Sequence, residues 1–476
     1  MRLLVTVANF LLEKQGSSIN KEEINNIIEN LKEKKIYKPR KTSSHNTFRR
    51  KISLLCYFMI GYWNGNKSSF IFSPLGKLYL DNFYSENPTN RNYIFLSLLF
   101  SIQYPHPHSG SPPYQLFPFR LIFKLLTDNR LGDVLYNYEI FMLVIKTKDN
   151  TRESYENLIQ EILKYRSKND EEIEKLIKDN PYEYVNPLTE WDCYTIKLLK
   201  SHNLISVEEV SSNKIGLFHK PRNENANSAK RIYQKKSISI NSNYLDFIKA
   251  LLEEWRFDEK PIQLNNPNSL YIENVKLVYS KLPNVLLDYN VVSKENKKDR
   301  ELFDIPKLID LHSKNIEIGS SRQFEEIIEK AMNLFDDVKA ERISGAGNTD
   351  IECLYIVSPN DKHKFNIDAK STAKKLIQIN PGRLKQHIAK TNAKYCIVIT
   401  PEYSRGAIRD IQEEKIVVLT SSSLSQLITQ WIISRQRELS FRGIHEIINN
   451  NYGRDISEEV YNLTFKTYGS SVNLGG

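Results

Sequence analysis

Two strand-like segments joined by a polar turn constrain the fold of this chain more than any other stretch. The strand-like run 351–357 is followed by the turn-forming sequence Pro-Asn-Asp at 359–361, and a second strand-like run ends at 370. A tight turn between two strands predicts an antiparallel hairpin. Because Asp350 precedes the first strand and Asp368 closes the second, we expect both carboxylates at the same end of the hairpin.

The residues that follow Asp368 extend this pattern. Side chains of a strand alternate between its two faces, so Asp368 and Lys370 are expected on one side and Ala369 on the other. Two carboxylates and an ammonium at one place suit a Mg²⁺ ion bound beside a phosphodiester. An Asp-x-Lys sequence is also typical of a solvated strand edge, and this is the competing interpretation.

A helix is predicted just upstream of the hairpin. Its apolar residues recur at helical spacing and form one stripe: Phe324, Ile327, Ile328, Ala331, Leu334 and Phe335. Glu325, Glu326 and Glu329 lie off this stripe. From this pattern alone we expect an amphipathic helix with solvated glutamates, and for Glu326 this is the preferred interpretation.

Further elements are predicted after the hairpin. Asn-Pro-Gly at 380–382 is typical of a helix start, and the helix that follows contains Gln386. Apolar runs at 395–399 and 416–419 predict strands, with a charged helix at 405–414 between them. The alternation of helices and strands predicts a mixed α/β sandwich.

This arrangement resembles the core of the PD-(D/E)XK nucleases, although Thr349-Asp350 stands where the family pattern has Pro-Asp. The resemblance implies that Asp350, Asp368 and the carbonyl of Ala369 hold Mg²⁺. It implies that Lys370 orients the attacking water or helps to deprotonate it. Glu325 matches the helix acid of the family, and Glu329 and Gln386 are candidates for a supporting role.

Composition sets outer limits on the function. A chain of 476 residues with 40% hydrophobic residues is expected to hold several domains. Lysine and arginine (67) exceed aspartate and glutamate (57), and the net charge of +10 favours a polyanionic partner. Scattered cysteines indicate a reducing cytoplasm, and no apolar run approaches the roughly 20 residues that span a membrane. Without a Gly-rich phosphate loop, ATP-driven translocation is not expected.

The N-terminal segment has the pattern of a winged helix. Two helical patterns and a basic loop lead to a third helix with Arg49, Arg50 and Lys51 in its first turns. A turn containing Lys67 and a strand at 70–72 then predict a β-hairpin. We expect these basic residues to contact bases or phosphates, although a solvated basic face is the alternative.

A loop rich in proline and aromatic residues, 104–118, runs into a helix that begins Pro-Phe-Arg, with Arg120 third. Over residues 70–145 this pattern resembles the DNA-recognition part of AlwI-like type IIS restriction endonucleases and, more distantly, FokI-like enzymes. Arg120 is therefore a predicted DNA contact. A later basic segment, 220–236, includes Lys230 and Arg231, which we expect to follow a phosphate backbone.

The predicted fold is a multidomain α+β protein with N-terminal winged-helix-like recognition modules and a C-terminal α/β PD-(D/E)XK domain. The expected segments are a winged-helix module (1–85), a second helical module (86–165), a third with the basic segment (166–255), a linker (256–315) and a nuclease domain (316–476).

The predicted function is that of a type IIS restriction endonuclease. Such an enzyme hydrolyses double-stranded DNA at a distance from an asymmetric site, depends on Mg²⁺ and leaves 5′-phosphate ends. Second-strand cleavage would need a transient homodimer or a partner subunit. The alternatives are a strand-specific nicking enzyme, the large subunit of a heterodimeric restriction enzyme, or a DNA-binding regulator whose C-terminal domain is not catalytic.

Overall fold

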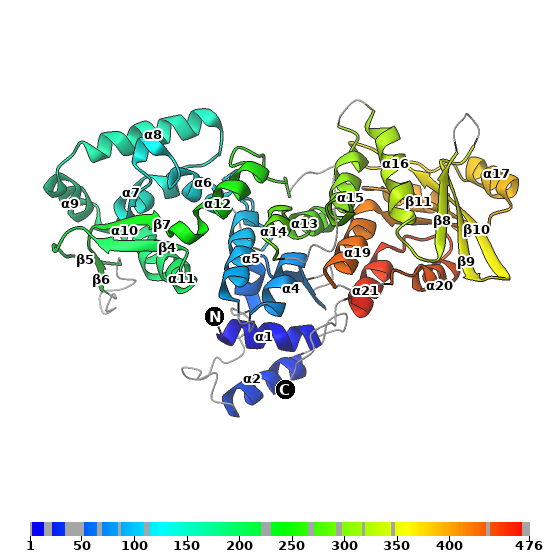
Figure 1. Ribbon diagram of the computed structural model, residues 1–476, viewed down its shortest axis with the longest axis horizontal. Helices are drawn as coiled ribbons and strands as arrows, with labels where there is room; N and C mark the ends of the chain where they lie inside the picture. Colours follow the sequence, from blue (N-terminus) through cyan, green and yellow to red (C-terminus); the bar gives the residue numbers. More distant parts are fainter. Residues whose placement is uncertain are drawn as a thin grey trace. The chain divides into compact units, whose positions relative to one another are not determined.

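The computed structural model describes residues 2–13, 21–33, 52–63, 69–83, 87–108, 114–219, 230–264, 271–291, 298–316, 319–343, 348–434 and 438–468. The chain divides into two compact units (Figure 1). Unit 1 combines residues 1–84 with 263–476, and unit 2 is formed by residues 85–262. The boundaries of these two units differ from those of the five segments expected from the sequence, because the N-terminal segment packs with the C-terminal one.

The centre of unit 1 is a five-stranded mixed sheet with the order β12-β11-β10-β9-β8. Its strands are β8 (Val338–Arg342), β9 (Ile351–Ser358), β10 (Asp361–Ala369), β11 (Cys396–Thr400) and β12 (Ile416–Thr420). The strands β8, β9 and β10 pair antiparallel, whereas β10, β11 and β12 run parallel. The predicted hairpin and the two later strands are therefore confirmed.

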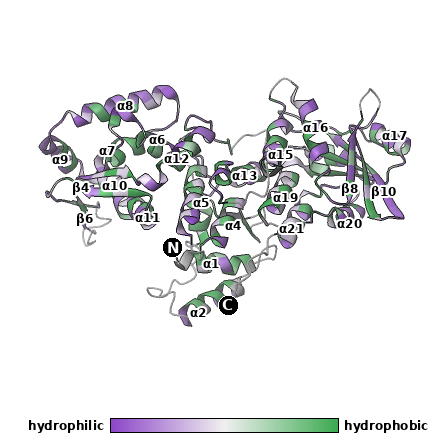
Figure 2. Cartoon of the chain, viewed as in Figure 1, coloured by the Kyte–Doolittle hydropathy of each residue, from purple (hydrophilic) through white to green (hydrophobic). Residues whose placement is uncertain are grey.

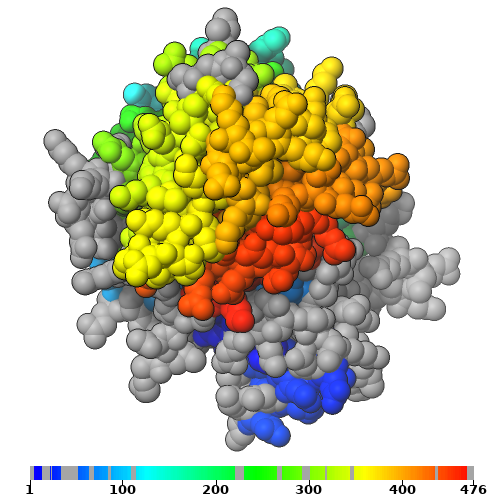
Figure 3. All heavy atoms as spheres, turned by 90° about the vertical axis from the view of Figure 1, so that its right-hand side faces the viewer, coloured from blue at the N-terminus to red at the C-terminus, as the bar shows by residue number. Residues whose placement is uncertain are grey.

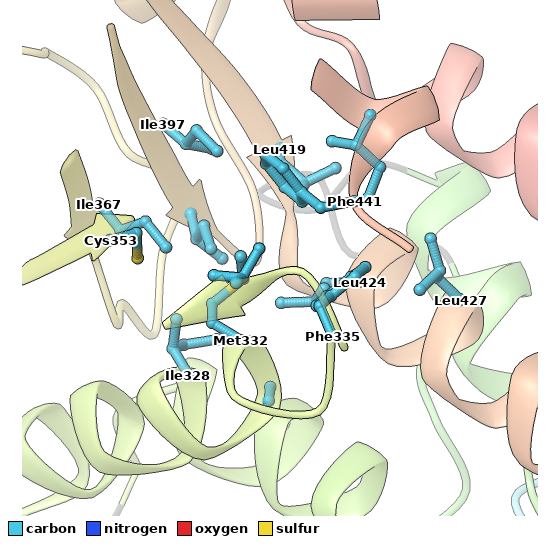
Figure 4. Packing of buried hydrophobic residues seen from close by; sticks show 14 of the residues in the cluster. Ile328, Met332, Phe335, Cys353, Ile367, Ile397, Leu419, Leu424, Leu427 and Phe441 are labelled. Carbon is cyan, nitrogen blue, oxygen red and sulfur yellow. The ribbon is translucent and has the colours of Figure 1, made fainter. Parts of the chain in front are cut away.

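Helices cover both faces of this sheet. On one face the apolar stripe of α16 packs into a core with β11, β12 and α19, and Figure 4 shows Ile328, Met332 and Phe335 gathered near Leu419 and Phe441. The opposite face has a smaller core, in which Val398 and Val418 pack with Leu384. Parallel strands buried on both faces are expected to be continuously apolar, as β11 and β12 are. Figure 3 shows the surface that these C-terminal segments present, in yellow, orange and red.

The helices around this sheet have the following bounds: α15 (Lys298–Ser313), α16 (Ser320–Met332), α17 (Pro381–Thr391), α18 (Arg405–Asp410), α19 (Ser421–Ser434), α20 (Arg442–Asn450) and α21 (Ser457–Tyr468). The expected linker, 256–315, contains α13 (Tyr271–Tyr279), α14 (Val285–Asp288) and α15. Since α15 packs against both α16 and α19, much of that segment is part of the body of unit 1.

The N-terminal part of unit 1 has the elements that the sequence predicts. Its parts are α1 (Arg2–Glu13), α2 (Lys21–Glu33), a helical stretch at 52–57, the antiparallel strands β1 (Gly61–Trp63) and β2 (Phe70–Phe72), and α4 (Pro74–Asp81). The identification as a winged helix stays a prediction.

Buried polar contacts join this N-terminal part to the C-terminal helices. The ammonium of Lys77 on α4 donates to the carbonyl of Tyr468 on α21, and the Tyr62 and Tyr461 hydroxyls bond each other. The Tyr279 hydroxyl donates to the Cys56 carbonyl over 2.8 Å. The two segments of unit 1 are thus tied by specific hydrogen bonds within an apolar interior.

Unit 2 is mainly helical, with two small sheets. Its helices are α5 (Pro88–Ser101), α6 (Pro118–Leu125), α7 (Asn137–Met142), α8 (Arg152–Arg166), α9 (Asp170–Asp179), α10 (Pro181–Leu188), α11 (Ile196–Ser201) and α12 (Ser242–Glu254). Short 3-10 turns lie at Asn129–Leu131 and Val144–Lys146, and a π-helix at Thr189–Thr195. Figure 2 shows hydrophilic and hydrophobic residues mixed along α8, as expected for a helix with one buried face.

The strands of unit 2 are β3 (Leu135–Tyr136), β4 (Ile205–Glu209), β5 (Ile215–Phe218), β6 (Lys230–Tyr233) and β7 (Lys236–Ile240). Strands β3, β7 and β4 form one sheet and β5 and β6 form a hairpin. In neither unit does a described helix have the length and apolar character needed to cross a bilayer.

Arg120 of α6 organises the interior of unit 2. Its side chain is fully buried, donates to the carbonyls of Phe100 (2.8 Å) and Arg256 (3.0 Å) and forms an ion pair with Glu259. Its guanidinium also lies 3.6 Å from the centroid of the Phe117 ring. The prediction that Arg120 contacts DNA is therefore wrong for this structure, because the buried guanidinium is occupied by partners within the unit.

Replacing this buried cation should destabilise unit 2. Arg120→Ala would leave the acceptors that it serves unpaired, and we expect the free energy of unfolding to fall by about 3 kcal/mol or more. Arg130→Ala is the matched control, because the exposed Arg130 pairs with Asp128 and Glu156 at the surface, where such pairs contribute about 1 kcal/mol or less. Urea unfolding of both variants measures the difference, and an equal effect would contradict this role.

A buried carboxyl in unit 1 should make stability depend on pH. Asp310 on α15 accepts a hydrogen bond from Ser425 over 3.1 Å, while its Oδ1 is shut off from solvent without a partner among the described residues. Burial raises the pKa of Asp310 to about 7. The folded state then binds the proton more tightly than the unfolded state does, so protonation of Asp310 adds to the free energy of unfolding. This contribution is complete below the unfolded pKa near 3.9 and is lost as pH rises through about 7.

Asp310→Asn should remove this dependence. We expect the variant to gain stability over the parent as pH rises from 5 to 8, by at most about 1.4 kcal/mol for each pH unit. Urea unfolding at several pH values measures this difference. Glu301→Gln, at an exposed position of the same helix, is the control and should give a pH-independent offset. A constant offset for Asp310→Asn as well would contradict the assignment.

Candidate active site

The register of β9 and β10 places two acids side by side. Ile351 pairs with Ile367, so Asp350 and Asp368 are the next opposing positions at that end of the hairpin. On its other side β10 pairs in parallel with β11, where Asp368 lies opposite Val398. The candidate site therefore lies at the end of an interior strand of the sheet, whose backbone is fixed by neighbours on both sides.

Lys370 connects the two carboxylates. Its Nζ lies 2.8 Å from Oδ1 of Asp368 and 3.5 Å from Oδ2 of Asp350. Oδ2 of Asp350 also accepts the backbone N–H of Ala369 over 2.8 Å. The Asp368 side chain is only 2% exposed, whereas those of Asp350 and Lys370 are 21% and 29% exposed. The structure thus brings the three predicted residues together, with an opening to solvent on the side of Asp350 and Lys370.

Glu325 on α16 belongs to the same electrostatic cluster. Burial raises the pKa of Glu325, the charges of Asp350 and Asp368 raise it further, and Arg342 and Lys370 oppose the shift. Burial and the neighbouring charge of Asp368 likewise raise the pKa of Asp350. The raised pKa values of Glu325 and Asp350, caused in part by neighbouring negative charge, mark a site where an added cation would be favourable.

Two residues of α17 join the cluster, although the sequence analysis did not single them out. An Nη of Arg383 lies 2.8 Å from Oδ1 of Asp368. One turn further on, His387 is buried, and its pKa is lowered by burial and by the charge of Arg383. Residues four positions apart lie on the same face of a helix. The spacing of Arg383 and His387 was therefore the feature of the sequence that could have identified them as a pair. Gln386, the predicted residue, is exposed instead.

The other glutamates of α16 have structural contacts. Glu329 accepts the backbone N–H of Arg342 over 3.0 Å and so fastens β8 to the helix. Glu326 pairs with Arg322 (3.2 Å) and with the guanidinium of Arg342 (2.7 Å), and its side chain is 40% exposed. Glu326 therefore lies at the surface, as expected, and Glu329 supports the sheet without a contact to the Asp350 cluster.

The carboxylates define what kind of metal ion the site suits. Within the described ranges, no three His, Cys, Asp or Glu side chains are grouped so that they hold a metal ion by themselves. The hydrogen bonds of the described residues use Oδ2 of Asp350 and Oδ1 of Asp368, which leaves the other carboxylate oxygens for further ligands. A hard cation that keeps several water ligands, as Mg²⁺ does, fits this sparse oxygen set.

The predicted DNA contacts are distributed over the chain. Arg49, Arg50, Lys51 and Lys67 lie outside the described residues. Lys230 is exposed on β6, whereas Arg231 is partly buried and donates to Oγ1 of Thr189 over 3.2 Å.

Comparison with known proteins identifies the family. The family model described as type II restriction endonuclease HgaI, N-terminal domain, matches residues 1–255. The type II restriction enzyme HgaI of Avibacterium volantium is 36% identical over 477 residues, which cover 98% of this chain and 96% of that protein.

Solved structures of restriction endonuclease FokI, alone and bound to DNA, match with TM-scores of 0.27 and 0.26 and 10% identity. They cover 86% of this chain and 83% and 82% of theirs, a likeness too low to support further argument. The narrower resemblance to AlwI-like enzymes stays a prediction. The match over more than half of the chain and the full-length relative agree, and the chain belongs to the HgaI family of type II restriction endonucleases.

Proposed function

We propose that this endonuclease is of type IIS and cuts double-stranded DNA at a distance from its recognition site. The hydrolytic part of this proposal is supported most by the convergence of Asp350, Asp368 and Lys370 at the end of β10. The element order, with α16 before the hairpin and α17 after it, is that of the PD-(D/E)XK core to which we assign residues 316–476.

The metal ion that we propose for this site is Mg²⁺. Asp350, Asp368 and the carbonyl of Ala369 would hold it, because they offer hard oxygen atoms beside a cluster with an excess of negative charge. When bound, it would offset negative charge on the scissile phosphate and make a water molecule more acidic.

The residues of the chain supply the remaining chemistry. The Lys370 ammonium, anchored between two carboxylates, is positioned to orient the attacking water, and after losing one proton to solvent its neutral Nζ would accept a proton from that water. In-line attack on phosphorus, with the 3′ oxygen as leaving group, gives a 5′-phosphate end. Arg383, on α17, restrains the Asp368 carboxylate through an ion pair. It also brings a second positive charge towards the phosphate.

We assign recognition of the DNA sequence to the N-terminal part of the chain. Lys230 would be one of its DNA contacts, and winged-helix modules would form its scaffold. Each chain has one Asp350-Asp368-Lys370 cluster, so cutting both strands requires a second copy, a partner subunit or a reorientation. We propose double-stranded DNA as the substrate and the cytoplasm as the location, because the cysteines Cys56, Cys193, Cys353 and Cys396 are free.

Removal of a carboxylate should stop cutting but not binding. Asp368→Ala is expected to slow DNA cleavage by about 10³-fold or more, since the loss of transition-state stabilisation is several kcal/mol. A gel shift with the same duplex should persist. Cleavage by this variant at the parent rate would refute the site assignment.

Adjacent glutamates of α16 provide a matched pair. The charges of the Asp350-Asp368-Lys370 cluster act on the Glu325 carboxylate. The Glu326 carboxylate instead accepts hydrogen bonds from Arg322 and Arg342. We expect Glu325→Gln to lower the cleavage rate by about 10-fold or more and Glu326→Gln to leave it nearly unchanged. Single-turnover cleavage measures both, and equal effects of the two substitutions would exclude a specific role for Glu325.

The number of strands cut can be read from a supercoiled plasmid incubated with Mg²⁺. We expect linear or fragmented product from a double-strand endonuclease. Open circles that persist would indicate strand-specific nicking, and a plasmid that stays supercoiled would indicate a binding protein without catalysis. Sequencing the fragment ends gives the distance between recognition and cleavage.

A further inference from the structure

Unit 2 contains a hollow of about 490 Å³ that none of the predicted DNA contacts lines. It opens between α6, α8, α12 and the loop that follows α12. Its lining consists of Lys124, Thr127, Arg152, Lys249, Leu252, Glu253, Arg256, Phe257 and Asp258. A hollow of this size accepts a small charged group and its surroundings, such as one phosphate with its sugar.

The lining has an excess of positive charge, with four cations and two acids. One acid is shared: the Asp258 carboxylate accepts Arg152 Nε over 3.2 Å and Arg256 Nη over 2.8 Å. The exposed Arg152 and Arg256 side chains are 78% and 61% accessible. In the described part of the chain, neither Lys124 nor Lys249 is in a salt bridge, so their ammonium groups remain for an external anion.

Buried groups hold the wall of the hollow in place. Arg120 donates to the carbonyl of Arg256 over 3.0 Å, and the Asn150 amide donates to the carbonyls of Phe257 and Glu259. The ring of Phe257 packs against Tyr155, with 4.8 Å between the centroids. Because the loop is fixed from inside the unit, a ligand would meet a preformed site and would not have to order it.

We propose that this hollow, which we name the α6–α12 hollow, receives a backbone phosphate of the DNA substrate. Lys124 and Lys249 neutralise the phosphate, and the apolar surfaces of Leu252 and Phe257 cover the neighbouring sugar. Arg152 is the first residue of α8, so the N-terminus of this helix adds favourable partial charge. Such a contact positions the protein on the duplex and is independent of sequence. The proposal rests on the DNA-cleaving function proposed above.

The salt dependence of DNA binding tests the α6–α12 hollow. The full-length double variant Lys124→Ala, Lys249→Ala is compared with the parent on a duplex of arbitrary sequence, without divalent metal and over a range of salt concentrations. We expect affinity to fall about 10-fold at low salt. The slope of log K against log salt should decrease by about 1, as expected when one phosphate contact is lost.

Two controls separate this effect from others. Lys164→Ala, Lys197→Ala removes two exposed lysines of unit 2 outside the hollow and should leave the slope unchanged. Thermal unfolding of both variants identifies any loss through misfolding. Lys124→Arg, Lys249→Arg keeps the charge and should retain most of the binding.

The possible results distinguish a failure of the phosphate contact from a failure of the proposed nuclease function. If the parent binds and cuts DNA but the slope of the alanine variant equals that of the parent, the phosphate contact is refuted while the nuclease assignment stands. Binding of millimolar inorganic phosphate to the parent, abolished in the alanine variant while DNA affinity and slope stay those of the parent, would assign the hollow to a free anion and refute the DNA contact. A parent that neither binds nor cuts DNA would refute the proposed function itself.

Discussion

The pairing of β9 with β10 is the constraint on which the rest of the candidate site depends. Strand side chains change face at every residue, so a shift of the register by one position would separate Asp350 from Asp368. The Asp350 carboxylate itself secures the register, because it accepts the N–H of Ala369 at the point where the hairpin ends. The pairing of β10 with β11 on the other side keeps this strand in the middle of the sheet. The acids and the lysine therefore meet on a rigid frame.

Local sequence patterns were enough to predict the elements of this frame. The hairpin turn, the apolar stripe of α16 and the Asn-Pro-Gly start of α17 each depend on neighbouring residues and are all present. Helical spacing alone did not tell which face of α17 approaches the strands, because that depends on how the helix packs on β10. Arg383 rather than Gln386 therefore reaches Asp368. Likewise, nothing local distinguishes the buried Arg120 from a surface arginine, since its partners come from 20 and 136 residues away.

Long-range pairing also explains why the domain boundaries could not be placed from the sequence. The segment 256–315 is polar and was expected to be a linker, yet α13 and α15 within it pack against α19. In α15 the apolar positions Phe303, Ile305 and Ile309 are buried among charged residues that mask the pattern. Buried lysine and tyrosine side chains, such as Lys77 and Tyr62, complete contacts between segments nearly 400 residues apart. Composition cannot reveal such partners.

The discontinuous make-up of unit 1 has a consequence for how the protein is made. Residues 85–262 leave the ribosome before the C-terminal half of unit 1 exists, so unit 2 can fold while residues 1–84 still await their partners. The Asp350-Asp368-Lys370 cluster is made after unit 2, and α19 and α21, which belong to the core that supports it, are made later still. During synthesis unit 2 can therefore be complete before β10 has been made, and a chain that stops before β10 lacks both Asp368 and Lys370.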